Sequence, residues 1–195
     1  MHDFYTTLID VGYYSRKDMV FPPHSINNTL CSELHVDPTG IEVIENIPFP
    51  CTEQASQISP ILHDSRALVF TDDEHLLISR DPTNGDWGPE ERRLDYLSPW
   101  ELPLTMRTAV PGKILLLSVR ENTIRKLDVW APSMKLKDRH GISVPRPDEP
   151  LHYLNNLPRP ATDVIKEHIK KVRTLEVIPI ADGRRGTFVG RDQDP

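Results

Sequence analysis

Two apolar runs on either side of a short polar turn form the strongest hydrophobic pattern in the sequence. Residues 113–119, KILLLSV, are apolar enough to be buried on both faces of a sheet, and residues 123–130, TIRKLDVW, alternate between apolar and polar side chains. Glu121 and Asn122 lie between the runs, and asparagine tolerates the positive φ of a tight turn. The pattern predicts a β-hairpin that serves as scaffold rather than as a reactive edge.

Three further runs have the composition of strands. Residues 66–71 and 75–79 are rich in β-forming side chains and flank a short acidic turn, which predicts a second hairpin. Residues 100–106, WELPLTM, predict another strand, and Pro103 places it at a sheet edge because proline lacks a backbone N–H. Together the runs predict an antiparallel sheet of about five strands, in sequence order, within residues 66–129.

Helical periodicity appears near both ends of the chain. An amphipathic helix over residues 162–175, capped by Thr162, is expected to pack on the sheet, with lysines on its other face. Asp37 followed by Pro38 predicts the start of a helix of about three turns, and a shorter helix is expected around residues 26–34. The apolar positions of the C-terminal helix are Ile165, Ile169, Val172 and Leu175.

These elements divide the 195 residues into five segments of one α+β domain. The N-terminal helical arm, with its many prolines, is expected to wrap the sheet, because it lacks the apolar surface to fold alone. The long loop is too polar and too rich in proline to belong to the core. The segments are the arm (1–62), the sheet (63–130), the long loop (131–158), the closing helix and strand (159–180) and a polar tail (181–195).

Composition and charge restrict the partners and the compartment. The formal net charge of -6 repels nucleic acid and anionic membranes. No apolar run approaches the ~18 residues of a membrane span, and the N-terminus lacks the basic region of a signal peptide. Cys31 and Cys51 form neither a disulfide framework nor a thiolate metal site. We therefore expect a cytoplasmic protein that binds neither nucleic acid nor membranes.

Catalytic and cofactor motifs are missing from the sequence. The eight histidines show no HxH or HExxH spacing, and there is no GxSxG, GxGxxG or P-loop. No metal, nucleotide or flavin cofactor is expected, and no catalytic residue can be named. The acidic residues 72–74, beside His75, are interpreted as a solvated hairpin tip, with a cation or acid–base role as the alternative.

Aromatic and basic side chains near the predicted sheet are the best binding candidates. The three tryptophans lie at loop or strand margins, where an indole covers apolar surface and still donates a hydrogen bond. With arginines at its base, such a group could line a pocket for an apolar ligand that bears a carboxylate. Alternatively, the tryptophans seal sheet edges and the arginines face water. The candidates are Trp87, Trp100, Trp130, Arg107, Arg125 and His63.

The C-terminal half of the chain resembles a known superfamily. A strand WELPLT, the hairpin KILLLSVRENTIRKLDVW, a long loop and the helix PATDVIKEHIKKVRTLEVIPI follow one another within residues 100–180. This order is similar to that of uncharacterised fungal proteins, some of which resemble the SUKH superfamily in their C-terminal half. The resemblance implies an α+β sheet-and-helix fold that serves mainly as a protein-binding module.

Two functions from different classes are consistent with these features. The first is a non-catalytic protein- or ligand-binding module of a fungal cytosolic protein, whose partner is another protein or an apolar small molecule. The second is a cofactor-independent isomerase or cyclase of secondary metabolism, acting on an apolar metabolite by positioning and polarisation. An enclosed apolar cavity lined by tryptophans would indicate the enzyme, and an exposed apolar patch with little enclosed volume would indicate the module.

Overall fold

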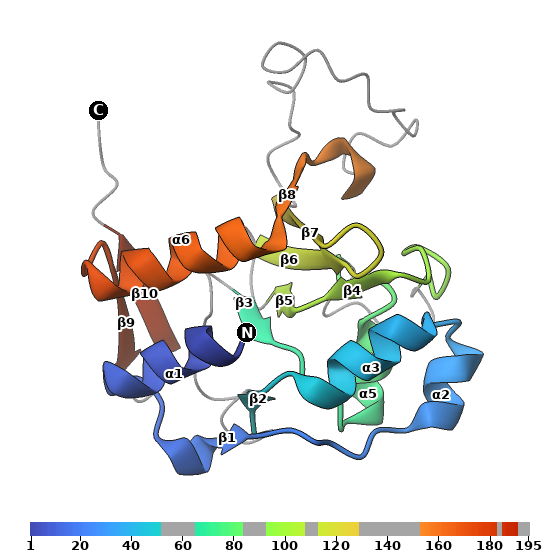
Figure 1. Cartoon of the computed structure of the whole chain (residues 1–195), viewed down its shortest axis with the longest axis horizontal. Helices are drawn as coiled ribbons and strands as arrows, with labels where there is room; N and C mark the ends of the chain where they lie inside the picture. The colour runs from blue at the N-terminus through green and yellow to red at the C-terminus, as the bar shows by residue number, and fades with distance from the viewer. Residues whose placement is uncertain (52–64, 84–92, 108–112, 129–152, 183–184, 191–195) are drawn as a thin grey trace.

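A computed structural model describes six stretches of the chain, in which helices combine with antiparallel strands (Figure 1). The fold is therefore mixed α+β. The main sheet has four strands in the order β4 (Glu101–Pro103), β6 (Lys113–Ser118), β7 (Thr123–Asp128) and β8 (Pro158–Pro160). The described residues are 1–51, 65–83, 93–107, 113–128, 153–182 and 185–190.

The β6–β7 hairpin forms the centre of the main sheet, as the sequence predicts. The two strands pair antiparallel along their whole length. Asn122 in the connecting turn has φ 52°, in the left-handed region that asparagine tolerates. Leu115 and Leu116 point to opposite faces of β6 and are 1% and 0% exposed, so the strand is buried on both sides. In β7, Leu127 is buried and Lys126 is exposed.

The run WELPLTM forms two short strands that belong to different sheets. β4 pairs with β6 at an edge of the main sheet, where Pro103 is tolerated. β5 (Thr105–Arg107) pairs instead with β3 (Ser65–Ala67). Leu104, which lies between β4 and β5, donates its N–H to the Leu115 carbonyl of β6 at 2.7 Å. This hydrogen bond keeps the second sheet against the first. The predicted edge strand is confirmed, but residues 100–106 form two strands instead of one.

The second strand of the predicted N-terminal hairpin is a helix, α5 (Asp73–Ile78). Asp72 caps it, because its side chain accepts the Glu74 N–H at 2.9 Å, and the acidic residues lie at the positive end of the helix dipole. The Val69 N–H donates to Nδ1 of His75 at 2.9 Å, which holds the helix against the preceding strand. The interpretation of the acidic residues as a hairpin tip is therefore wrong.

The N-terminal arm contains three helices and a short two-stranded sheet. The predictions for α2 and α3 are confirmed: Pro38 occupies the first turn of α3, and Asp37 accepts the Thr39 N–H at 2.8 Å. The helix α1 was not predicted. Figure 1 shows α2, α3 and α5 gathered at one end of the molecule. The elements are α1 (His2–Asp10), η1 (Arg16–Asp18), β1 (Met19–Val20), α2 (Asn28–Glu33), α3 (Pro38–Asn46) and β2 (Phe49–Pro50).

The C-terminal helix α6 (Ala161–Arg173) packs on the sheet and on α1, as Figure 1 shows. Val164 and Val172 of α6 share one apolar cluster with Leu8 of α1 and Ile124 of β7. The predicted packing of this helix on the sheet is thus confirmed. The N-terminal arm supplies the other wall of the same cluster, which anchors both ends of the chain to one sheet.

Two details of the predicted C-terminal helix are wrong. The helix begins at Ala161 without a side-chain cap, and the Ala161 N–H donates instead to the Asn122 carbonyl at 3.0 Å, so Thr162 is not the cap. Leu175 follows the helix with φ 58° and is 62% exposed, because the left-handed turn carries its side chain away from the apolar stripe.

The end of the polar loop and the tail hold more structure than their composition predicts. Residues 131–152 of the long loop lie outside the described part of the chain, but η4 (Tyr153–Asn155) follows them, and Tyr153 is 3% exposed. This part of the loop therefore contributes to the core, contrary to the prediction. After α6, β9 (Val177–Asp182) pairs with β10 (Arg185–Gly190). None of the described helices is long and apolar enough to cross a membrane.

Replacing Leu115 by alanine tests the central role of the hairpin. The side chain is 1% exposed, and truncating a buried leucine leaves a cavity, so the free energy of unfolding should fall by about 2 to 5 kcal/mol. Leu175→Ala removes the same atoms from a side chain that is 62% exposed and should change it by less than about 0.5 kcal/mol. Urea unfolding measures both values. Equal losses would contradict the burial assigned to Leu115.

Candidate functional site

The predicted binding residues lie in different parts of the molecule. Trp87, Trp130 and His63 are outside the described residues. The Arg120 guanidinium lies 5.1 Å from the centroid of the Trp100 ring, a cation–π contact at the start of β4. The structure places the remaining two, Arg107 and Arg125, in β5 and β7 with 9% and 7% of their surface exposed. Neither they nor Trp100 line the cavity formed by residues 33–35, Arg80 and residues 94–99.

That cavity has a volume of about 480 Å³ and is open to solvent. Three separate segments line it: the end of α2, the residue Arg80 after α5, and the segment 94–99. Its inner wall contains buried side chains, and its rim contains exposed ones. The inner residues are Leu34, Arg80 and Leu97, the half-buried ones are Tyr96 and Ser98, and the rim residues are Glu33, His35, Leu94, Asp95 and Pro99.

The end of α2 adopts a strained conformation at the rim of the cavity. His35 has φ 54°, a left-handed conformation that a helix end usually assigns to glycine. Its N–H donates to the Ser32 carbonyl at 3.1 Å, and the Val36 N–H donates to the Cys31 carbonyl at 3.0 Å, which is the Schellman pattern. A side chain at this position costs stability, and such costs cluster at binding sites. The turn places His35 in the lining of the cavity.

Arg80 contributes a buried guanidinium to the inner wall, with 1% of its surface exposed. Nη1 donates to the Glu101 carbonyl at 3.3 Å, and Nη2 donates to the carbonyls of Leu97 and Ser98. Nε has no hydrogen-bond partner among the described residues. Burial lowers the pKa of Arg80, and Tyr153 and Glu101 partly oppose that shift. The side chain thus holds the segment that forms one wall of the cavity.

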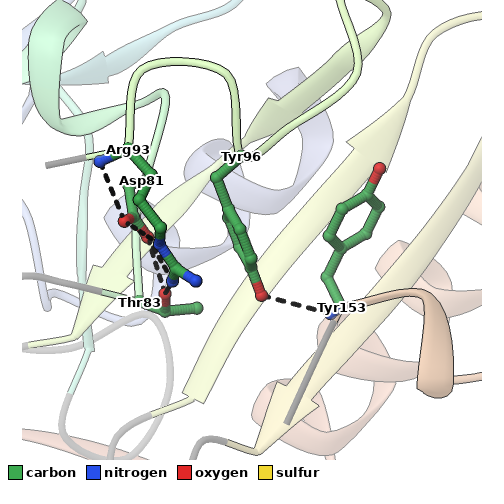
Figure 2. A network of polar contacts seen from close by, with 5 residues as sticks. All are labelled: Asp81, Thr83, Arg93, Tyr96 and Tyr153. Carbon is green, nitrogen blue, oxygen red and sulfur yellow. Dashed lines mark hydrogen bonds and ion pairs between the residues drawn. The ribbon is translucent and has the colours of Figure 1, made fainter. Parts of the chain in front are cut away.

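A polar network fixes the other end of that segment (Figure 2). The Asp81 carboxylate, buried beside Arg80, accepts Nε of Arg93 at 2.9 Å and the hydroxyl of Thr83 at 2.6 Å. The Arg93 guanidinium lies 4.0 Å from the centroid of the Tyr96 ring. The Tyr96 hydroxyl in turn accepts the Tyr153 N–H at 3.2 Å. These contacts orient the Tyr96 ring, which forms part of the cavity lining.

A row of buried polar side chains crosses the main sheet on the face turned away from α6. Glu101 in β4 lies opposite Ser118 in β6, which lies opposite Thr123 in β7. In the described part of the chain, Oε2, Oγ and Oγ1 of these residues are buried without a hydrogen-bond partner. On the same face of β7, Nη1 of Arg125 donates to the Asn156 carbonyl at 2.6 Å. Buried polar groups without a partner are costly. We call this row the second polar centre, after the one formed around Arg80 and Asp81.

The carboxyl group of Glu101 has a pKa above its usual range. Burial raises its pKa to about 7. The guanidinium groups of Arg125 and Arg80 lower it in part, and Glu121 adds a smaller upward effect. A carboxyl group that titrates near neutral pH suits acid–base chemistry, although structural networks shift pKa values as well. The Glu101 side chain does not line the 480 Å³ cavity.

Among the described residues, no three His, Cys, Asp or Glu side chains are placed to hold a metal ion. Cys31 and Cys51 are free thiols. Burial raises the pKa of Cys31, which keeps the thiol protonated and therefore a weak nucleophile.

Comparison of the chain with protein-family models, with curated proteins and with solved structures finds no match. The resemblance to the SUKH superfamily therefore stays a prediction. Sequence reasoning missed Arg80, which ends an apolar run that was assigned to a strand. The only signal was local: an arginine and an aspartate, Arg80 and Asp81, directly follow buried apolar residues.

The substitution Glu101→Gln tests the buried carboxyl. Its pKa of about 7 in the folded chain lies above the value of 4.5 in an unfolded one. Folding therefore favours the protonated form, and this contribution is lost as the pH rises from about 4.5 to about 7. Glutamine cannot ionise, so the variant should gain up to about 3 kcal/mol relative to the wild type across that window.

Urea unfolding of both proteins between pH 4.5 and 8 measures this difference. Other titrating groups cancel in the comparison, including His168, whose pKa burial lowers to about 4. A free-energy difference between the two proteins that does not change with pH would contradict the raised pKa of Glu101.

Proposed function

We propose that the protein is a non-catalytic ligand-binding module in the cytosol and that the Arg80 cavity is its binding site. The cavity carries this proposal, since its volume of about 480 Å³ falls within the roughly 300 to 1,000 Å³ of small-molecule sites. Its lining also has their usual composition, with apolar walls from Leu34 and Leu97 and a few polar groups.

The cavity residues favour binding over catalysis. Catalysis by a nucleophile needs a base within hydrogen-bond reach of it. The one hydroxyl of a serine or threonine in the lining belongs to Ser98, and its hydrogen bond joins Tyr153 at 3.1 Å rather than a base. The resemblance of residues 100–180 to binding modules points the same way.

A cofactor-independent isomerase or cyclase is the second candidate, and Glu101 is the observation that favours it. A carboxyl with a pKa of about 7 beside the hydroxyl of Ser118 could exchange protons with an apolar substrate. This function requires a substrate to reach the sheet face opposite α6. Mass spectrometry after incubation with apolar polyenes would detect a product of unchanged mass and altered retention.

Amide shifts in NMR spectra test the binding role. Titration with a mixture of neutral, anionic and cationic aromatic fragments should shift residues 33–35 and 94–98 first. Leu34→Trp fills the cavity and should weaken fragment binding at least ~10-fold, since the site is then occupied by the protein's own indole. Leu175→Trp adds the same group at an exposed position and should leave binding unchanged. Thermal unfolding confirms that both variants are folded.

Two results would oppose this proposal. Unchanged fragment binding by folded Leu34→Trp would exclude the cavity as the site. Shifts confined to Glu101, Ser118 and Thr123 would place binding on the sheet face and favour the second candidate.

A further inference from the structure

We infer that the ligand of this cavity is a monocarboxylate with a compact apolar body and that the guanidinium of Arg80 receives its carboxylate. This inference rests on the binding role proposed above. It assigns the chemical class of the ligand, which the cavity's shape alone leaves open.

The first reason is that Arg80 is a buried charge without a counter-ion. It is 1% exposed, and its partners in the described chain are three backbone carbonyls rather than a carboxylate. Asp81 is adjacent in sequence, but its carboxylate is paired with Arg93. Glu101 is at most a partial counter-charge, because burial raises the pKa of its carboxyl to about 7 and its hydrogen bond from Arg80 is accepted by the backbone carbonyl. A buried charge is costly unless it is paired, so an anion that enters the cavity would supply the counter-charge that the protein itself lacks.

The second reason is that Arg80 retains a donor. A guanidinium has five N–H groups in a planar arrangement. Three of them donate to the carbonyls of Leu97, Ser98 and Glu101, and the Nε N–H is buried away from solvent, which leaves one Nη1 N–H for a ligand. A carboxylate oxygen is a strong acceptor for that N–H, because a hydrogen bond between two charged groups is stronger than one between neutral groups. The carbonyl contacts hold the side chain in place, so a ligand would not have to order it.

The third reason concerns the rest of the lining. Leu34 and Leu97 offer buried apolar walls, and Tyr96 adds a ring whose position is fixed by its contact with Arg93. The rim carries the exposed carboxylates of Glu33 and Asp95. They disfavour phosphates and dicarboxylates most, because repulsion grows with the charge of the ligand. The cavity therefore suits one negative charge on an apolar body.

The opposite assignment gives Glu33 and Asp95 the recognising role, so that the ligand is a cation and Arg80 is only structural. Pairs of probes with the same body and opposite charge separate the two. We would titrate indole-3-acetate against tryptamine, and hexanoate against hexylamine, and follow the amide shifts of residues 33–35 and 94–98. We expect each carboxylate to bind at least ~10-fold more tightly than its amine, since one buried ionic contact has about that effect.

The outcomes separate the ligand class from the binding role. Tighter binding of the amines, or shifts from neutral fragments alone, would overturn the carboxylate assignment and leave the binding role intact. If no carboxylate, amine or neutral fragment shifts these residues, both inferences fail.

Substitutions sharpen the test. Glu33→Gln combined with Asp95→Asn removes two exposed charges without touching the core, and it should tighten carboxylate binding by about 2- to 5-fold and weaken amine binding. Weaker carboxylate binding by this variant would overturn the inference. Arg80→Lys keeps the charge but cannot donate to three carbonyls and a ligand at once, so carboxylate affinity should fall ~10-fold while amine affinity changes little.

Arg80 also holds the segment 97–101, so Arg80→Lys needs a control for folding. The melting temperature and the chemical shifts of residues far from the cavity, in α6, provide it. The double rim variant remains decisive if Arg80→Lys does not fold, because Arg80 is intact in that protein.

Discussion

Burial of the β6–β7 hairpin on both faces is the constraint on which the rest of the structure depends. On one face, Ile124 packs in a cluster with α1 and α6. On the other, Leu116 and Leu127 pack with Leu97 and Tyr153. A hairpin whose apolar side chains are buried on both faces needs cover on both, so the N-terminal arm, the segment before β4 and the C-terminal helix all pack around it.

Glu101 connects the two polar centres of the molecule. Its carbonyl accepts a hydrogen bond from Arg80 at the cavity, while its side chain lies in the buried row beside Ser118. Arg80 and Arg125, whose charges lower its pKa in part, are 1% and 7% exposed, and burying a charge in the interior of a protein is costly. Hydrogen bonds to carbonyls offset only part of that cost, and both centres depend on the apolar packing of the hairpin beneath them.

The acidic character of the protein does not decide which charge the cavity prefers. The formal net charge of -6 acts over long distances, where salt screens it within about 10 Å. Two charges 4 Å apart interact by about 1 kcal/mol in water and about 4 kcal/mol near a protein surface. On these magnitudes, a ligand carboxylate would interact more strongly with the buried guanidinium of Arg80 than with the exposed carboxylates of Glu33 and Asp95, which water screens.

Local chemistry determined a definite part of this protein. Three features depend only on residues that are close in sequence, and all three were predictable. They are the alternation of residues 113–130, the Asp37-Pro38 start of α3 and the apolar spacing of α6. Residues 75–79 were not, because their strand-like composition is opposed by the cap that Asp72 supplies and by the burial of Leu76. The cavity could not be predicted either. Its lining joins residues 33–35, Arg80 and residues 94–99, and a charge becomes buried and unpaired only when such distant segments close around it.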